Sequence, residues 1–189
     1  MKKPKFNLRS LGKRMTDDLA EVFAKADSND LEKLCDALLH ARRIACFGVG
    51  REGLMMQAVC MRLMHAGLNA HYVGDMATPP IGRGDLLFAS AGPGHFPTVE
   101  ALLSVARNAG AQTAVVTAQP KRAAKMPVDL LIYLPAQTMV DVDQKISVMT
   151  MGSHYEAAQL LYFDILTIRL LERTNQKREN MYTRYTNLK

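Results

Sequence analysis

A glutamate and two histidines stand near glycine-rich segments and could move protons in a catalytic site. Glu156 lies near the expected start of a long helix, His154 is two positions before it, and His95 follows a glycine-rich segment. A partly desolvated carboxylate can remove a proton from a carbon next to a carbonyl group. The alternative is a surface carboxylate near a helix N-terminus. We predict Glu156, His95 and His154 as catalytic residues.

A glycine-spaced turn follows the first apolar segment of the chain. The turn contains Gly48, Gly50 and Gly53 in the spacing G-x-G-x-x-G. Backbone N–H groups and the positive end of the following helix can face an anionic ligand there. Arg51 could polarise a substrate oxygen or hold a carboxylate or sulfonate, or it could pair with Glu52 or Asp75. There are two alternatives for this turn. It could bind no ligand, or it could bind a nicotinamide dinucleotide whose ribose contacts Asp75.

The composition is that of an ordinary globular protein. The chain has 189 residues, of which 48% are hydrophobic and 22% charged. We find no apolar segment long enough to span a bilayer and no secretory signal. Its net charge of +6 includes basic residues near both ends, among them Lys2, Lys3 and Lys5. Without a basic face interleaved with aromatic residues, we expect no nucleic-acid partner.

The three cysteines, the histidines and the glutamate give no metal-binding spacing. Cys35, Cys46 and Cys60 lie within apolar patterns and are expected to be reduced core residues of a cytoplasmic protein. His95, His154 and Glu156 show no ligand spacing, so we predict no metal. We also predict no cofactor.

Short apolar segments alternate with helical patterns along the chain. Strands are expected at 44–47, 70–73, 85–89, 113–117 and 130–134, and the main helices at 8–25, 31–39, 52–65, 97–109 and 151–173. This alternation predicts an α/β protein in which a doubly wound parallel sheet carries helices on both faces. We expect one domain, 1–189, with N-terminal helices at 8–40, an α/β core at 44–150 and a C-terminal helix and tail at 151–189.

Loops at the carboxyl ends of the expected strands are the natural ligand site of such a sheet. Three of these loops are rich in glycine or polar residues. They lie at 48–53, 74–78 and 90–95. We predict that Gly48, Gly50, Arg51, Glu52, Ser90, Gly92, Gly94 and Thr98 bind the substrate.

Several motifs resemble the sugar isomerase (SIS) domain family, and within it the 6-phospho-3-hexuloisomerase branch. They are GVGREGL at 48–54, MRLMHAG at 61–67, TPPIGRGDLL at 78–87, MGS at 151–153 followed by Glu156, and RYTNL at 184–188. The resemblance implies a three-layer α/β/α sandwich with a five-stranded parallel, flavodoxin-like sheet. It also implies isomerisation of a sugar through an enediol, with the base at Glu156. The family works without a redox cofactor and usually without a metal, as a tetramer with sites near subunit contacts.

The phosphate-binding part of the family pattern is altered in this sequence. Family members carry Ser-Gly-Ser-Gly-x-Thr after the third strand, where this chain has AGPGHF at 91–96. Pro93 also lacks an N–H group, and Glu52 stands where the family has a serine. Ser90 and Thr98 could replace part of the lost hydroxyl groups. Tyr185 stands at the position of a family histidine.

We therefore expect an aldose–ketose isomerase whose sugar substrate is either phosphorylated or phosphate-free. Its partner is a small sugar or sugar derivative, and we expect a tetramer or dimer. The first alternative is a sugar-binding or sensing protein that has lost catalysis, which the missing hydroxyls and tail histidine favour. The second is a nicotinamide-binding domain, although the chain leaves no room for a substrate domain.

Overall fold

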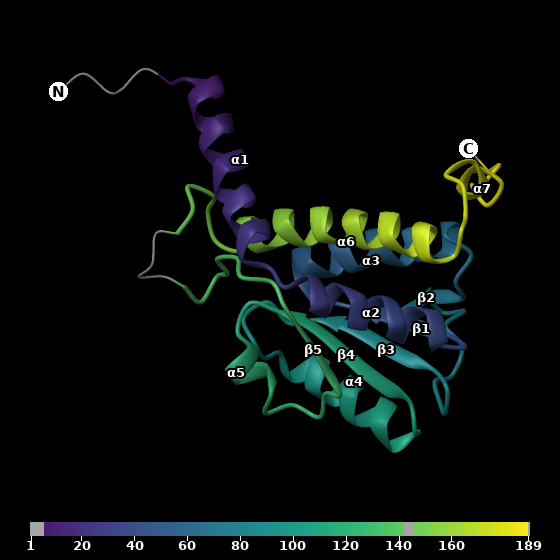
Figure 1. The fold of residues 1–189 in the computed structure, drawn as a ribbon. Coiled ribbons are helices and arrows are strands. Elements are labelled where there is room, and N and C mark those ends of the chain that lie inside the picture. The colour runs from purple at the N-terminus through teal and green to yellow at the C-terminus, as the bar shows by residue number, and fades with distance from the viewer. Residues whose placement is uncertain (1–5, 142–145, 189) are drawn as a thin grey trace.

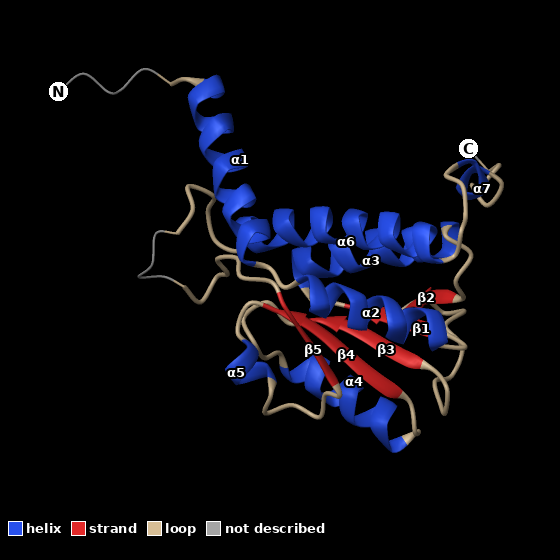
Figure 2. Ribbon diagram, viewed as in Figure 1, coloured by secondary structure: helices blue, strands red, loops and turns tan. Residues whose placement is uncertain are grey.

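A computed structural model describes residues 6–141 and 146–188; Lys2, Lys3, Lys5 and Lys189 lie outside these ranges. Five parallel strands form one sheet in the order β2-β1-β3-β4-β5. The strands are β1 (Ile44–Phe47), β2 (Ala70–Tyr72), β3 (Leu86–Ser90), β4 (Gln112–Thr117) and β5 (Leu130–Tyr133). Figures 1 and 2 show the strands side by side between two helical layers. The predicted parallel α/β sandwich is thereby confirmed.

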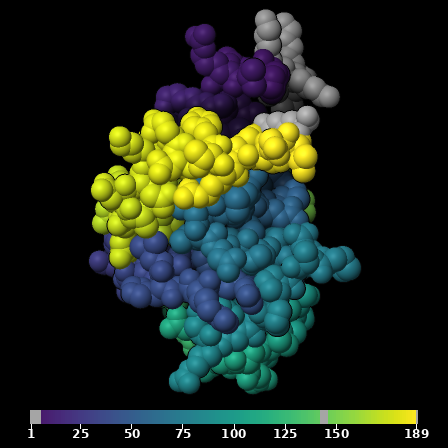
Figure 3. All heavy atoms as spheres, turned by 90° about the vertical axis from the view of Figure 1, so that its right-hand side faces the viewer, coloured from purple at the N-terminus to yellow at the C-terminus, as the bar shows by residue number. Residues whose placement is uncertain are grey.

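Helices cover the two faces of the sheet unequally. The helices are α1 (Leu8–Lys25), α2 (Ser28–His40), α3 (Gly50–His65), α4 (Pro97–Asn108), α5 (Pro120–Ala123), α6 (Ser153–Arg173) and α7 (Glu179–Tyr182). The larger core cluster joins the sheet to α2, α3 and α6, whereas the smaller one joins it to α4 and α5. Helix α1 projects beyond these layers, and Figure 3 shows α6 and the C-terminal tail on the outer surface.

Side-chain caps decide where the first two helices begin. Asn7 accepts a hydrogen bond from the Ser10 N–H group, and Asp27 accepts one from the Asn29 N–H group. Such caps satisfy backbone donors that have no partner within the helix. The sequence predicted this helix at 31–39, but α2 already begins at Ser28 because Asp27 is its cap.

The central strand and the longest helix meet in the larger core. All five residues of β3 are buried, as expected for a strand with neighbours on both sides. Phe88 of β3 packs edge-to-face against Phe163 of α6, with ring centroids 5.6 Å apart. This packing holds α6 across the sheet and sets the position of its first turn.

The strand register brings the expected ligand loops to one edge. Phe47 pairs with Ala89, and Ser90 pairs with Val116, so β1, β3 and β4 end close together. The turn at 48–50 and the loop at 91–96 leave the sheet from neighbouring strands. No helix of the described ranges is long and apolar enough to cross a membrane.

Candidate active site

The Glu52 carboxylate connects the two glycine-containing loops. Glu52 lies in the first turn of α3 and is 5% exposed. Its Oε2 atom accepts hydrogen bonds from Ser90 Oγ at 2.5 Å and from the Gly92 N–H group at 2.9 Å. A Cβ atom at Gly92 would lie 2.8 Å from Glu52 Oε1, so the close approach requires glycine there.

Burial changes the protonation of Glu52 and its neighbour Tyr155. Loss of hydration raises the pKa of Glu52, and the nearby Glu156 raises it further. The hydrogen bonds from Ser90 and Gly92 lower this pKa, but the net shift is upward. The buried Tyr155 hydroxyl donates to the Val116 carbonyl at 2.9 Å and lies 3.3 Å from Ser90 Oγ. Burial also raises the pKa of Tyr155, which keeps the phenol neutral. Ser90 is thus held between two side chains from different helices.

Glu156 and Arg51 form an ion pair beside this cluster. Glu156 lies in the first turn of α6, 7% exposed, and its Oε2 atom is 3.1 Å from Arg51 Nε. The contact lacks hydrogen-bond geometry, so this solvent-shielded oxygen has no hydrogen-bond donor among the described residues. Arg51 donates instead to Ser153 Oγ at 2.8 Å. The alternative pairing of Arg51 with Glu52 or Asp75 is not the observed one.

The two partners differ in their exposure to solvent. The Arg51 side chain is 65% exposed, whereas that of Glu156 is 10% exposed. An exposed arginine can turn toward a substrate oxygen, while the shielded carboxylate keeps its position. The pair therefore combines a poorly hydrated base with a cation that can follow the substrate.

The remaining predicted binding residues shape the backbone of the two loops. A Cβ atom at Gly48 would lie 3.0 Å from the Gly53 backbone, and Gly50 and Gly94 have φ angles of 58° and 89°. Thr98 is exposed in the first turn of α4. Their proposed contacts with substrate stay predictions.

The two predicted catalytic histidines have other partners. His95 Nε2 lies 2.9 Å from Glu100 Oε2 within its own loop and helix. His154 Nδ1 accepts from the Gln137 N–H group at 3.0 Å, so Nε2 carries the proton and donates to the Asp18 carbonyl at 3.2 Å. His154 therefore ties α6 to α1 and to the segment after β5. Their catalytic roles stay predictions that this arrangement does not favour.

The structural position of His154 predicts a pH effect on stability. Burial lowers its pKa below the ordinary value of about 6.5. Between the pKa of His154 in the folded protein and its pKa in the unfolded chain, the unfolded chain binds more protons. The free energy of unfolding therefore rises with pH in this range, and the protein loses stability as the pH falls. We expect a weaker slope in His154→Gln than in the exposed control His40→Gln, measured by urea denaturation from pH 5 to 7.5. Equal slopes in all three proteins would contradict this role.

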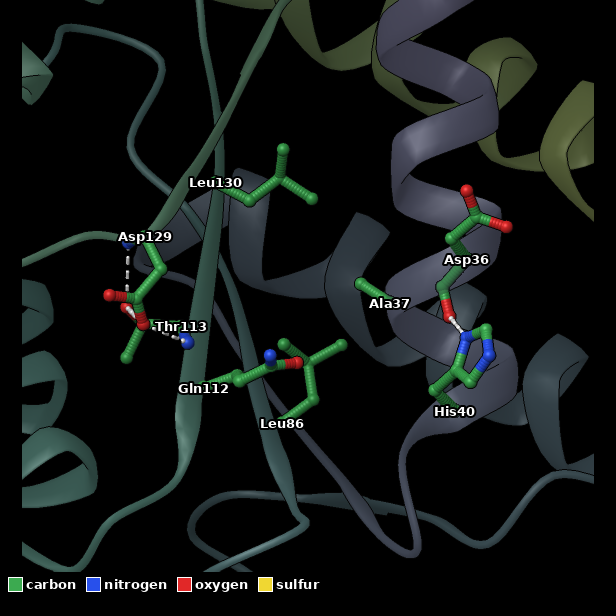
Figure 4. A pocket seen from close by; sticks show the side chains of 8 residues that line it. All are labelled: Asp36, Ala37, His40, Leu86, Gln112, Thr113, Asp129 and Leu130. Carbon is green, nitrogen blue, oxygen red and sulfur yellow. Dashed lines mark hydrogen bonds between the residues drawn. The ribbon is translucent and has the colours of Figure 1, made fainter.

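A separate pocket lies at the opposite edge of the sheet. Figure 4 shows its lining residues, which include Leu86 and Gln112, the first residues of β3 and β4. Its volume is about 310 Å³. Two of its polar side chains are bound within the protein: His40 to the Asp36 carbonyl and Asp129 to Thr113. No three His, Cys, Asp or Glu side chains of the described ranges are placed to hold a metal.

The C-terminal tail lies at the other end of α3. Tyr185 stacks on His65 with ring centroids 5.4 Å apart, and Arg184 donates to the His65 carbonyl. Helix α3 has 16 residues, roughly 24 Å at 1.5 Å per residue. Tyr185 and Glu156 are therefore far apart within one chain.

Sequence reasoning missed two residues of the cluster. Tyr155 and Ser153 belong to the site through Ser90 and Arg51. Ser153 stood in the MGS motif without a predicted role, and Tyr155 had the pattern of an ordinary helix position. The spacing of three positions between Ser153 and Glu156 was the available signal, because such residues share one face of a helix. Tyr155 is adjacent to Glu156, and this spacing gave no such signal.

Comparison with known proteins identifies the family, although no family model matches the sequence. The chain is 31% identical to the 3-hexulose-6-phosphate isomerase of Bacillus subtilis over 173 residues, 91% of this chain and 94% of the relative. The crystal structure of a Methanococcus jannaschii protein, from which a molecular function of 3-hexulose-6-phosphate isomerase was inferred, superposes with a TM-score of 0.82 at 26% identity, covering 96% and 100% of the two chains.

The sugar isomerase domain of an RpiR transcription factor from Sphaerobacter thermophilus shares the fold, with a TM-score of 0.72 at 12% identity over 93% and 94% of the chains. The coverage of both chains in each comparison means that the likeness extends over the sheet and both helical layers. The chain belongs to the 3-hexulose-6-phosphate isomerase family of sugar isomerase domains.

Proposed function

We propose that this protein moves the carbonyl group of a sugar to the neighbouring carbon through an enediol, as an aldose–ketose isomerase. The observation that carries the proposal is the Glu156–Arg51 pair at the carboxyl edge of the sheet, with one shielded oxygen of Glu156 lacking a hydrogen-bond donor in the described chain. Glu156 acts as the base and Arg51 polarises the substrate oxygen. The family of the chain supports this assignment.

The proposed steps conserve all atoms and need no oxidant. Glu156 removes the proton from the carbon next to the carbonyl, and the carbonyl oxygen gains negative charge that Arg51 stabilises. Protonation of that oxygen gives the enediol. The second hydroxyl then loses its proton, and Glu156 returns a proton to the former carbonyl carbon.

The substrate class follows from the relatives, whose name specifies 3-hexulose 6-phosphate. We propose a hexulose or its 6-phosphate. The test is incubation of the protein in D₂O with 3-hexulose and 2-hexulose sugars, each with and without the phosphate. We expect deuterium at the carbon next to the carbonyl, measured by NMR. Binding without isomerisation of any sugar would instead support a sensing protein.

We further propose that the chain assembles with copies of itself. Helices α3 and α6 expose apolar side chains to solvent in the single chain. They are Leu54, Met61, Met64, Leu160, Leu161, Ile165 and Ile168, each 39–55% exposed. Leu161, Ile165 and Ile168 follow helical spacing and lie on one face of α6. Figure 3 shows the helix itself at the outer surface. Exposed apolar side chains gathered on a helix face are typical of subunit contacts.

A charge on this face is expected to prevent assembly. We expect the parent protein to elute as a dimer or tetramer, and Leu161→Lys/Ile165→Lys as a monomer, because burying two lysines in an apolar contact is unfavourable. Val105→Lys, at an exposed position of α4, is the control. Light scattering after size exclusion gives the masses. A monomeric parent at micromolar concentration would refute the interface.

We propose that the protein works in the cytoplasm on a small sugar, without a nucleic-acid partner. Cys35, Cys46 and Cys60 are free thiols and are buried in the core. Three unpaired thiols are typical of a reducing compartment. Basic residues distributed over several elements, several of them in ion pairs, give no support to a nucleic-acid-binding face.

A further inference from the structure

We propose that Glu52 is a specificity residue whose carboxylate occupies the anion-binding donors of the β3–α4 loop, so that the site takes a sugar with a hydroxyl group, not a phosphate, at the end facing this loop. The inference rests on the proposed isomerase function and specifies its substrate class. Glu52 lies at the edge where the strands end and where ligands of such sheets bind.

The hydrogen-bond donors of the loop segment from Ser90 to Gly94 are already used within the protein. Ser90 Oγ and the Gly92 N–H group both donate to Glu52 Oε2. The Ala91 N–H group donates to Val116, and the Gly94 N–H group donates to Ala91. Pro93 has no N–H group. From Ser90 to Gly94, therefore, every backbone or hydroxyl donor that the loop presents after β3 has an internal acceptor.

The carboxylate cannot easily make room for a second anion. Glu52 lies in the first turn of α3, which packs on the sheet. Space beside its carboxylate is limited, since a Cβ atom at Gly92 would lie 2.8 Å from Glu52 Oε1 and 2.7 Å from Tyr155 Cε1. A phosphate would have to take both hydrogen bonds from Glu52 and leave a buried carboxylate beside it. Two like charges at such separation repel each other strongly when water is excluded.

The charges beside Glu52 favour a neutral sugar end, while the cation Arg122 lies further along the loop, against Gly94. Glu156 lies near enough to Glu52 to raise its pKa, so two carboxyl groups share this corner. Arg51 is the cation beside them, and it is already paired with Glu156. Carboxylate oxygens only accept hydrogen bonds, and a sugar hydroxyl is a suitable donor to them. A dianionic phosphate beside Glu52 needs hydrogen-bond donors, but it would face carboxylate oxygens, which are acceptors.

The test compares Glu52→Ser, Glu52→Gln and the parent. Serine removes the charge and supplies a hydroxyl donor, whereas glutamine keeps the shape of the side chain if the serine variant does not fold. Glu172→Gln, an exposed position near the end of α6, is the control. The measurements are kcat/KM for a hexulose and its 6-phosphate, and the melting temperature with and without inorganic phosphate.

We expect the parent to prefer the phosphate-free hexulose by about tenfold or more, and inorganic phosphate to leave its melting temperature unchanged. In Glu52→Ser, the preference falls by about tenfold or reverses, and phosphate raises the melting temperature. Glu52→Gln loses the charge, but its amide oxygen can accept the same two hydrogen bonds, so we expect a smaller change in the same direction. The control variant behaves as the parent.

A parent that prefers the phosphorylated hexulose, with a ratio unchanged by the variants, would overturn the role of Glu52 and leave the isomerase function standing. If no hexulose is isomerised, the proposed function fails, but phosphate binding still decides the role of Glu52. Stabilisation of the parent by phosphate, equal to that of the variants, would then refute it.

Discussion

Replacement of Glu156 by glutamine is expected to lower kcat by about 10²- to 10⁴-fold, the usual contribution of a general base. Glutamine has nearly the same shape, but its amide cannot accept the substrate proton. The KM value should change little, because the proton transfer and not the binding is lost. Deuterium incorporation from D₂O into the sugar measures the same step directly.

Glu172→Gln is the matched control for this experiment. Glu172 lies on the same helix, is exposed, and pairs with Arg169. It should isomerise the sugar at the parent rate, and circular dichroism should show that both variants are folded. Parent-like activity of Glu156→Gln would show that another group is the base, and the enediol mechanism would need a different proton acceptor.

Replacement of Arg51 by methionine has the second-largest expected effect. We expect kcat/KM to fall by about 10²- to 10³-fold, as when one donor that stabilises a developing oxyanion is removed. Arg51→Lys should recover part of this loss, because an ammonium keeps the charge but not the planar fork. Steady-state kinetics on the sugar identified as substrate gives both values.

Stability separates this role of Arg51 from a structural one. Water screens the pair from the side of Arg51, whose side chain is 65% exposed, although that of Glu156 is only 10% exposed. We therefore expect Arg51→Met to lower the free energy of unfolding in urea by about 1 kcal/mol. Arg62→Met, which removes a pair with Asp164 in which both side chains are exposed, is the control further along α3. A fall in activity of the same size in both variants would argue against a direct role of Arg51.

Local sequence patterns were sufficient to predict most of the fold. The β1 strand was predicted at its observed bounds, 44–47, and the other strands within one residue at each end. The expected order of strands and helices, with the glycine turn between β1 and α3, is also observed. These features depend on hydrophobic periodicity and on glycine, which act over a few residues and can be recognised in a single sequence.

The sequence likewise indicated the candidate base and the family of the protein, because Glu156 closely follows the MGS motif at 151–153. It did not show that His154 bonds to the Asp18 carbonyl and the Gln137 N–H group. These partners come from two other parts of the chain. A histidine two positions from a glutamate has the same local pattern whether it is catalytic or structural.

The sequence by itself determined the layers of this protein, the edge at which its loops meet, the loss of hydroxyl groups from the loop at 91–96, and the presence of Glu52 in the first glycine turn. Only the tertiary structure decided that Glu52 turns inward and accepts from Ser90, 38 positions away, and Gly92, 40 positions away. The physical reason is that the direction of a side chain at a helix start depends on which distant loop packs against it. That packing is set by the strand register and by α6 across the sheet, and neither is visible in a local pattern.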